Sequence, residues 1–129
     1  MRITLIGLAL SFLAQDPAPA KIDLRVLYAG RPGSTREKEF LELFGAHFVK
    51  TAAIDVKKVT TTAAADWDVV VMDWSDIYPR DDKGKIIQNS TKLNTPQAQL
   101  PEGFSRATVM MGSVAGSVHR RQGLKLDWL

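Results

Sequence analysis

Apolar and polar residues along this chain follow two periods, one typical of strands and one typical of helices. Apolar segments of strand length predict four strands, at residues 24–29, 54–59, 68–74 and 107–111. The second segment alternates apolar with polar residues, which predicts a half-exposed strand. The third segment contains the continuous apolar run Val-Val-Val-Met at residues 69–72, which predicts a strand buried on both faces, as in a parallel sheet. The fourth segment is an apolar run that predicts a buried strand. A fifth strand is predicted to begin at Leu124.

A helix is predicted between the first two strands. Residues 34–37, Ser-Thr-Arg-Glu, have the form of a capping box. In this motif the Ser34 hydroxyl accepts a hydrogen bond from one free helix N–H, and Glu37 reaches back to another. Apolar residues then recur at spacings of three and four, which places them on one side of the helix. They are Phe40, Leu41, Phe44 and Phe48.

The order of these elements predicts an α/β fold with a mainly parallel sheet. A second helix is expected at about residues 114–122, and residues 75–105 are expected to form a long loop with a hairpin around 78–88. A loop of this length is more often functional or flexible than inert. Right-handed crossovers favour a flavodoxin-like three-layer sandwich with strand order 2-1-3-4, followed by the start of the fifth strand.

The N-terminal residues have the pattern of a signal peptide. Arg2 precedes an apolar run at residues 3–14, and Ala-Pro-Ala at 18–20 offers a cleavage site. The alternative is an ordinary first strand at residues 3–7. We expect a signal peptide at 1–20, a secreted or periplasmic location, and one domain at 21–129. The apolar run is shorter than the roughly 20 residues that a membrane helix needs, so no stable span is expected after cleavage.

Composition narrows the chemistry that this chain can carry out. Its 17 basic and 14 acidic residues give a net charge of +3, and the basic residues are scattered along the chain. Nucleic-acid binders more often concentrate basic residues in a stripe, so no nucleic-acid partner is expected. The chain has no cysteine, which excludes zinc ribbons, iron–sulfur clusters and thiol nucleophiles.

Ligands of open α/β sheets bind at the carboxyl ends of the strands, where the strand order reverses. Three loops are expected to meet there, at residues 30–35, 73–76 and 112–116. The first loop combines glycines, hydroxyls, a cation and a helix start, which are the ingredients of an anion site. The simpler alternative is a tight turn before a capped helix. The candidate residues for binding a small polar ligand, a sugar or an anion, are Gly30, Arg31, Ser34, Thr35, Asp73, Trp74, Ser113 and Val114.

No metal or cofactor is expected. The carboxylates at positions 73, 76, 81 and 82 lack the spacing of a calcium loop, and the last two fit a turn at residues 81–84. A flavin between Trp74 and Tyr78 is an alternative, but it lacks a complete phosphate loop. His47 is expected near the end of the first helix and His119 in the last turn of the second, outside any triad context.

Residues 112–116, Gly-Ser-Val-Ala-Gly, have the glycine spacing of a nucleophile elbow between a strand and a helix. The central position, which should carry serine or cysteine, carries Val114. No catalytic residue is therefore expected. Ser113 is predicted to be a helix N-cap.

These residues, together with 24–30 and 67–73, resemble the class I glutamine amidotransferase-like superfamily, which includes the ThuA-like proteins. The resemblance implies a flavodoxin-like fold and places Val114 at the position of the catalytic cysteine. A histidine and a glutamate of the family would follow beyond Leu129, so the chain resembles a shortened member. An incomplete fifth strand would leave a sheet edge unpaired and favour self-association through it.

Three functional hypotheses follow from the sequence. The first is a non-catalytic binding domain for a small polar ligand. The second is a hydrolase or amidase that uses Ser113 with His119 and Asp73. The third is an interaction module whose loop at 75–105 contacts a protein partner. Residues 89–91 also match a glycosylation sequon, which matters only for a protein secreted by a eukaryote.

Overall fold

Four parallel strands form one sheet with the order β2-β1-β3-β4, which confirms the predicted fold class. The structure is a computed structural model that describes residues 20–75, 78, 81, 83, 85–87, 96 and 98–122. The elements are β1 (Ile22–Gly30), α1 (Thr35–His47), β2 (Phe48–Asp55), the 3-10 turn η1 (Val56–Lys58), β3 (Val69–Trp74), β4 (Ala107–Gly112) and α2 (Ser113–Gln122). The expected signal peptide up to residue 19, the sequon at 89–91 and the fifth strand from Leu124 lie outside the described residues.

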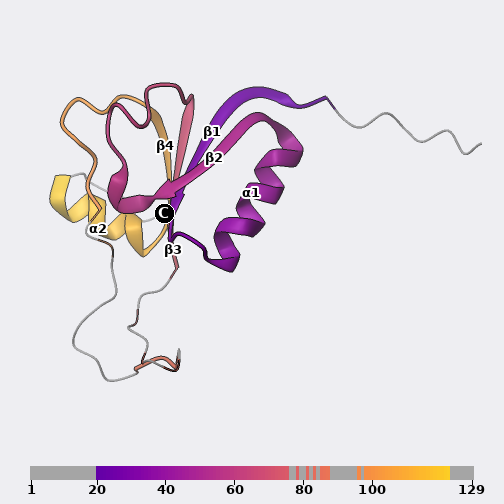
Figure 1. Cartoon of the computed structure of the whole chain (residues 1–129). Helices are drawn as coiled ribbons and strands as arrows, with labels where there is room; N and C mark the ends of the chain where they lie inside the picture. The colour runs from indigo at the N-terminus through magenta and orange to yellow at the C-terminus, as the bar shows by residue number, and fades with distance from the viewer. Residues whose placement is uncertain are drawn as a thin grey trace, which may run out of the picture.

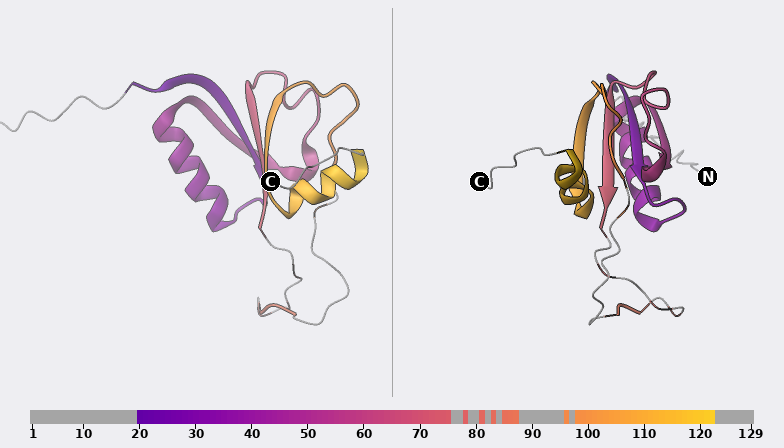
Figure 2. Two further views of the ribbon diagram at one scale, coloured as in Figure 1. Left: turned by 180° about the vertical axis from the view of Figure 1, so that it is seen from behind. Right: turned by 90° about the vertical axis from the view of Figure 1, so that its left-hand side faces the viewer.

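The two helices cover opposite faces of the sheet (Figure 1). The edge-on view in Figure 2 shows the strands between α1 on one side and α2 on the other. Helix α1 packs on β1 and β2, and α2 packs on β3 and β4. The described part of the chain therefore forms three layers, and neither helix is long and apolar enough to cross a membrane.

Aromatic rings join α1 to its face of the sheet. The ring of Tyr28 in β1 stacks on Phe40 with a centroid distance of 5.3 Å. Phe40 lies 5.4 Å from Phe44, and Phe44 lies 5.8 Å from Phe48. The spacing of four residues on a helix puts these rings in one row, and burying them anchors the helix to the sheet. Phe48 is the first residue of β2 rather than part of the helix, which corrects the predicted helix face.

The second strand begins and ends earlier than predicted. It was expected at residues 54–59 but spans Phe48–Asp55. The Asp55 carboxylate accepts a hydrogen bond from the Lys57 N–H at 2.9 Å and starts η1. Val56 and Val59 are nevertheless buried, because residues three apart share one side of a 3-10 turn. Their apolar pattern therefore reflects this turn and not a strand.

The fourth strand is an edge strand in the described sheet, and not a buried one as predicted. Its side chains are half-buried or exposed, and Val109 keeps 49% of its surface exposed. The reason is that α1 packs mainly over β1 and β2. On the α1 side of β4, Met111 is half-buried against the cluster that contains Phe44, whereas Val109 stays exposed. Its apolar sequence therefore predicted the strand correctly but not its burial.

Asp68, just before β3, clamps the start of that strand to β1. Its carboxylate accepts hydrogen bonds from the Arg25 N–H at 2.8 Å and from the Arg25 guanidinium at 3.0 and 2.7 Å. The Asp68 N–H donates in return to the Arg25 carbonyl oxygen at 2.9 Å. The side-chain and backbone hydrogen bonds from Arg25 lower the pKa of Asp68 to about 2. This clamp fixes the register of β3 against β1. A cleft opens at the other end of these two strands, where their carboxyl ends lie.

Candidate functional site

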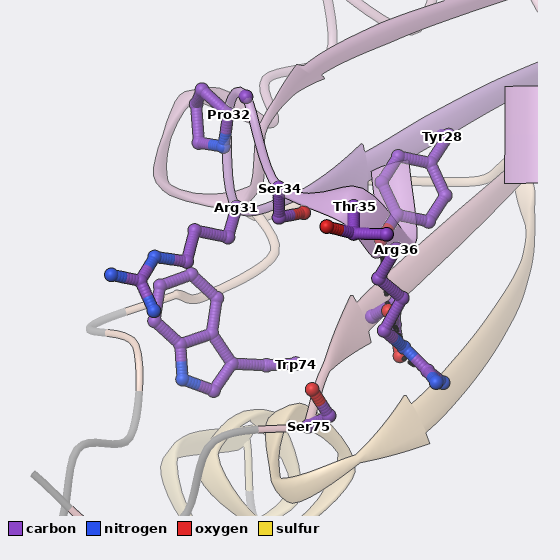
Figure 3. A pocket seen from close by; sticks show the side chains of 10 residues that line it. Tyr28, Arg31, Pro32, Ser34, Thr35, Arg36, Trp74 and Ser75 are labelled. Carbon is purple, nitrogen blue, oxygen red and sulfur yellow. Dashed lines mark hydrogen bonds and ion pairs between the residues drawn. The ribbon is translucent and has the colours of Figure 1, made fainter. Parts of the chain in front are cut away.

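A cleft of about 390 Å³ opens at the carboxyl ends of β1 and β3. Figure 3 shows the hydroxyls of Ser34, Thr35 and Ser75 facing one space between Trp74 and Arg36. The cleft lies at the point where the strand order reverses, because β1 connects to β2 on one side while β3 lies on the other. Its lining residues are Tyr28, Arg31, Pro32, Gly33, Ser34, Thr35, Arg36, Asp73, Trp74 and Ser75.

The N-terminus of α1 forms one wall of this cleft. The Ser34 hydroxyl accepts a hydrogen bond from the Glu37 N–H at 3.1 Å, which confirms the predicted cap. The Glu37 carboxylate accepts from the Gly33 N–H at 3.0 Å, one residue before the position that a capping box uses. Gly33 has a φ of +71°, a conformation that glycine adopts at little cost. The N–H groups of Thr35 and Arg36 stand in the first turn, where a helix offers no carbonyl to receive them.

Asp73 is the one buried charged residue in the described chain, with 2% of its surface exposed. Its carboxylate accepts a hydrogen bond from the Tyr28 hydroxyl at 2.8 Å. It also accepts two from the Arg36 guanidinium, at 2.5 Å from Nε and 3.0 Å from Nη2. A buried charge is tolerated when it is paired and hydrogen-bonded in this way. The network therefore joins the end of β3 to β1 and to the first turn of α1.

Burial, and then the hydrogen bond to Asp73, raises the pKa of Tyr28. The hydrogen bonds to Asp73 likewise raise the pKa of Arg36. Tyr28 therefore stays a neutral donor and Arg36 stays a cation over the whole physiological pH range. Arg36 pairs with Asp73, and Arg31 adds a further positive charge to the lining of the cleft. Together with the positive end of the α1 dipole, this charge favours an anion in the cleft.

The structure brings together five of the eight predicted binding residues. They are Arg31, Ser34, Thr35, Asp73 and Trp74. Gly30 ends β1 outside the lining, and a Cβ added there would lie 2.5 Å from the Tyr28 ring. Gly30 therefore makes room for the Tyr28 ring and does not line the cleft.

The loop at residues 112–116 contributes no residue to the lining of this cleft. The Ser113 hydroxyl donates to the Trp74 carbonyl oxygen at 3.1 Å, so it fastens the start of α2 to the end of β3. Val114 is fully buried in the apolar core between α2 and the sheet. A ligand in the cleft cannot reach its side chain.

The turn between β4 and α2 is not a nucleophile elbow. The strand-to-helix junction is present at the carboxyl edge of the sheet, and Gly112 has a φ of +69°. In an elbow, however, the central residue occupies the sharp turn and exposes its side chain. Here the sharp turn falls on Gly112, and Val114 is already the second residue of a regular helix. The glycine spacing thus predicted the junction correctly but not the direction of the central side chain.

Several lining residues were not predicted from the sequence. Tyr28 and Arg36 line the cleft and are hydrogen-bonded to Asp73, which is distant from both in sequence. Ser75 directly follows β3, within the predicted loop at 73–76, but was not among the named candidates. One signal was available for Tyr28. In the parallel register Tyr28 lies opposite Val71, so the Tyr28 and Asp73 side chains emerge on the same face of adjacent strands. A buried tyrosine hydroxyl needs a partner, and Asp73 is within its reach.

The proposed triad of Ser113, His119 and Asp73 is divided by the sheet. Asp73 bonds to Tyr28 and Arg36 on the α1 side, whereas His119 belongs to α2 on the other side. His47 is exposed at the end of α1, as predicted. Tyr78 is 47% exposed and does not line the cleft with Trp74.

Metal ligands do not gather in the described residues, where no three His, Cys, Asp or Glu side chains come together. Asp81 forms the predicted turn, in which its carboxylate accepts from the Lys83 and Lys85 N–H groups at 3.0 and 2.8 Å. Asp76 and Asp82, named with Asp73 as carboxylates of a metal site, lie outside the described residues.

Comparison with known proteins found no match among family models, curated proteins or solved structures.

Proposed function

We propose that this chain is a non-catalytic domain that binds a small polar ligand by an anionic group at the cleft between β1 and β3. One observation carries the proposal: the first turn of α1, the cation Arg31 and the hydroxyls of Ser34 and Thr35 all line the same cleft. Helix N–H groups and the helix dipole attract anions, and hydroxyls can donate to them.

Two related proposals come from the sequence. The N-terminal pattern supports export to the periplasm or the outside of the cell. N-terminal sequencing of protein from the exported fraction should then begin near Lys21, whereas an intact Met1 there would contradict cleavage of a signal peptide, and absence of the protein from that fraction would contradict export. The strand order 2-1-3-4 is compatible with kinship to the glutamine amidotransferase-like superfamily, which stays a proposal.

Binding can be tested with inorganic phosphate as the probe. A ligand at 100 times its Kd adds about 2.7 kcal/mol to the free energy of unfolding, so the melting temperature of the full chain should rise. Phosphate also stabilises proteins non-specifically by exclusion from their surface, so the comparison must be made between variants at constant ionic strength.

The informative variant is Arg31→Ala, matched with Lys38→Ala. Both remove one exposed positive charge, but only Arg31 lines the cleft. We expect Arg31→Ala to lose most of the phosphate-dependent rise and Lys38→Ala to keep it. Equal responses in both variants, or no rise in the native chain beyond that given by an excluded osmolyte, would overturn the proposal.

No observation favours the hydrolase alternative, since the Ser113 hydroxyl bonds to a backbone carbonyl and Asp73 lies across the sheet from His119. A fluorophosphonate probe that labelled Ser113 would reverse this preference.

The third hypothesis concerns residues 75–105, many of which lie outside the described residues. The exposed edge of β4 supports a further proposal, self-association of two chains through that edge.

A further inference from the structure

A second cleft, of about 360 Å³, adjoins the first. It lies between the loop after β1 and the end of β2, and its lining residues are Arg31, Pro32, Asp55, Lys57 and Trp74. Arg31, Pro32 and Trp74 line both clefts. The two clefts are therefore neighbours that share these side chains, and a ligand that occupies the first lies close to the second.

The second cleft offers different chemistry from the first. Lys57 is an exposed donor. The half-buried Asp55 carboxylate accepts the Lys57 N–H through Oδ1 and retains further acceptor capacity. A donor and an acceptor side by side match the hydroxyl groups of a sugar, each of which both donates and accepts. Pro32 and Trp74, which also line this cleft, offer apolar surface for the C–H groups of a sugar ring.

We infer that the two clefts hold one ligand, a sugar monophosphate. This inference rests on the proposed function of the first cleft. Its phosphate lies in the first cleft, against the first turn of α1 and the hydroxyls of Ser34 and Thr35. Its sugar ring lies in the second cleft, beside Asp55 and Lys57. Arg31 lines both clefts and contacts the phosphate where the two parts of the ligand join.

The test uses isothermal titration calorimetry of the full chain. The ligands are glucose 6-phosphate, fructose 6-phosphate and ribose 5-phosphate, with the three parent sugars and inorganic phosphate as controls at one ionic strength. We expect at least one sugar phosphate to bind about tenfold or more tighter than inorganic phosphate, because the ring adds contacts that phosphate lacks. The parent sugar alone should bind more weakly than its phosphate.

Two neighbouring lysines provide a matched pair of variants. Lys57 and Lys58 are both exposed residues of η1, but only Lys57 lines the second cleft. Lys57→Ala should remove the advantage of the sugar phosphate over inorganic phosphate and leave phosphate binding unchanged. Lys58→Ala should leave both affinities unchanged, which controls for the loss of one positive charge nearby.

The outcomes separate this inference from the proposed function. If inorganic phosphate binds but none of the three sugar phosphates binds tighter, the inference is wrong and the anion site stands. The same holds if the Lys57 and Lys58 variants behave alike, or if a parent sugar binds as tightly as its phosphate. If neither phosphate nor any sugar phosphate binds, the proposed function fails as well.

Discussion

At the scale of the residue, Asp73 determines how the cleft is built. Its buried carboxylate receives the Tyr28 hydroxyl from β1 and the Arg36 guanidinium from α1. Arg36 also lies over the Phe40 ring, 5.2 Å from its centroid. The first turn of α1 is thereby fixed to the ends of two strands, so the N–H groups that we expect to bind an anion are held in place before the ligand arrives.

Substitution of Arg36 by methionine tests this role. Methionine keeps an unbranched apolar stem over Phe40 but leaves the buried Asp73 carboxylate with the Tyr28 hydroxyl as its remaining side-chain donor. Loss of a partner for a buried polar group costs about 1–3 kcal/mol. The low end is expected because the Arg36 side chain is 44% exposed. Urea unfolding should show this loss of stability for Arg36→Met. The control is Lys38→Met on the same helix, which should change stability by much less. Equal effects of the two substitutions would contradict the role given to Arg36.

At the scale of the element, the two glycines of the segment at residues 112–116 have different roles, and the turn between β4 and α2 depends on the first. Gly112 has a positive φ, and a Cβ there would collide with the Trp74 carbonyl oxygen. Gly116 lies within α2, where a Cβ would meet no atom within 4 Å. The same substitution at the two positions should therefore have opposite effects.

Gly112→Ala should destabilise the chain by at least about 1–2 kcal/mol, the cost of a left-handed conformation for an L-residue. Gly116→Ala should stabilise it by about 0.5–1 kcal/mol, because alanine loses less conformational freedom in a helix. Thermal and urea unfolding of both variants would measure this. If Gly112→Ala were neutral, the turn would not have the conformation described.

The clamp between β1 and β3 makes a prediction about acid. The pKa of Asp68 is about 2 in the folded chain, below its ordinary value of 3.8, so ionised Asp68 stabilises the fold above pH 4. This contribution should fall as the pH drops from about 4 toward 2. Asp68→Asn should be less stable than the native chain at neutral pH and should show a smaller decline over that interval. Parallel curves of stability against pH for the two chains would exclude the clamp as a source of acid sensitivity.

Local signals predicted most of the elements, and long-range pairing explains what they missed. The cap at Ser34 and the run of valines in β3 depend on neighbours in sequence, and both were predicted correctly. The start of β2 depends on how Phe48 packs against Phe44. Because β2 directly follows α1, no turn residue marks the boundary between the helix and the strand in the sequence. In the site, the loop residues were predicted from glycines and hydroxyls, whereas Tyr28 and Arg36 join the site through their hydrogen bonds to Asp73, which is distant in sequence.

At the scale of the whole molecule, the sheet is unevenly covered. Helix α1 protects β1 and β2, and α2 protects the opposite face of β3 and β4. On the α1 side, Val109 is exposed and Met111 is half-buried. Within the described sheet β4 also has a neighbour on one side only, β3. This apolar strand carries no charged residue, and charged residues are one of the features by which proteins prevent edge-to-edge pairing.

The edge of β4 should therefore pair with the same edge of a second chain. The Val109→Lys variant places a charge on this strand, and two such charges meet when the strands pair, so association should weaken. Sedimentation equilibrium over a range of concentrations should show association of the native chain and a monomer for Val109→Lys. Leu43→Lys is the control, since Leu43 is 51% exposed on α1, away from the edge. A native chain that stayed monomeric, or a Leu43→Lys variant that lost association equally, would show that the β4 edge is not an interface.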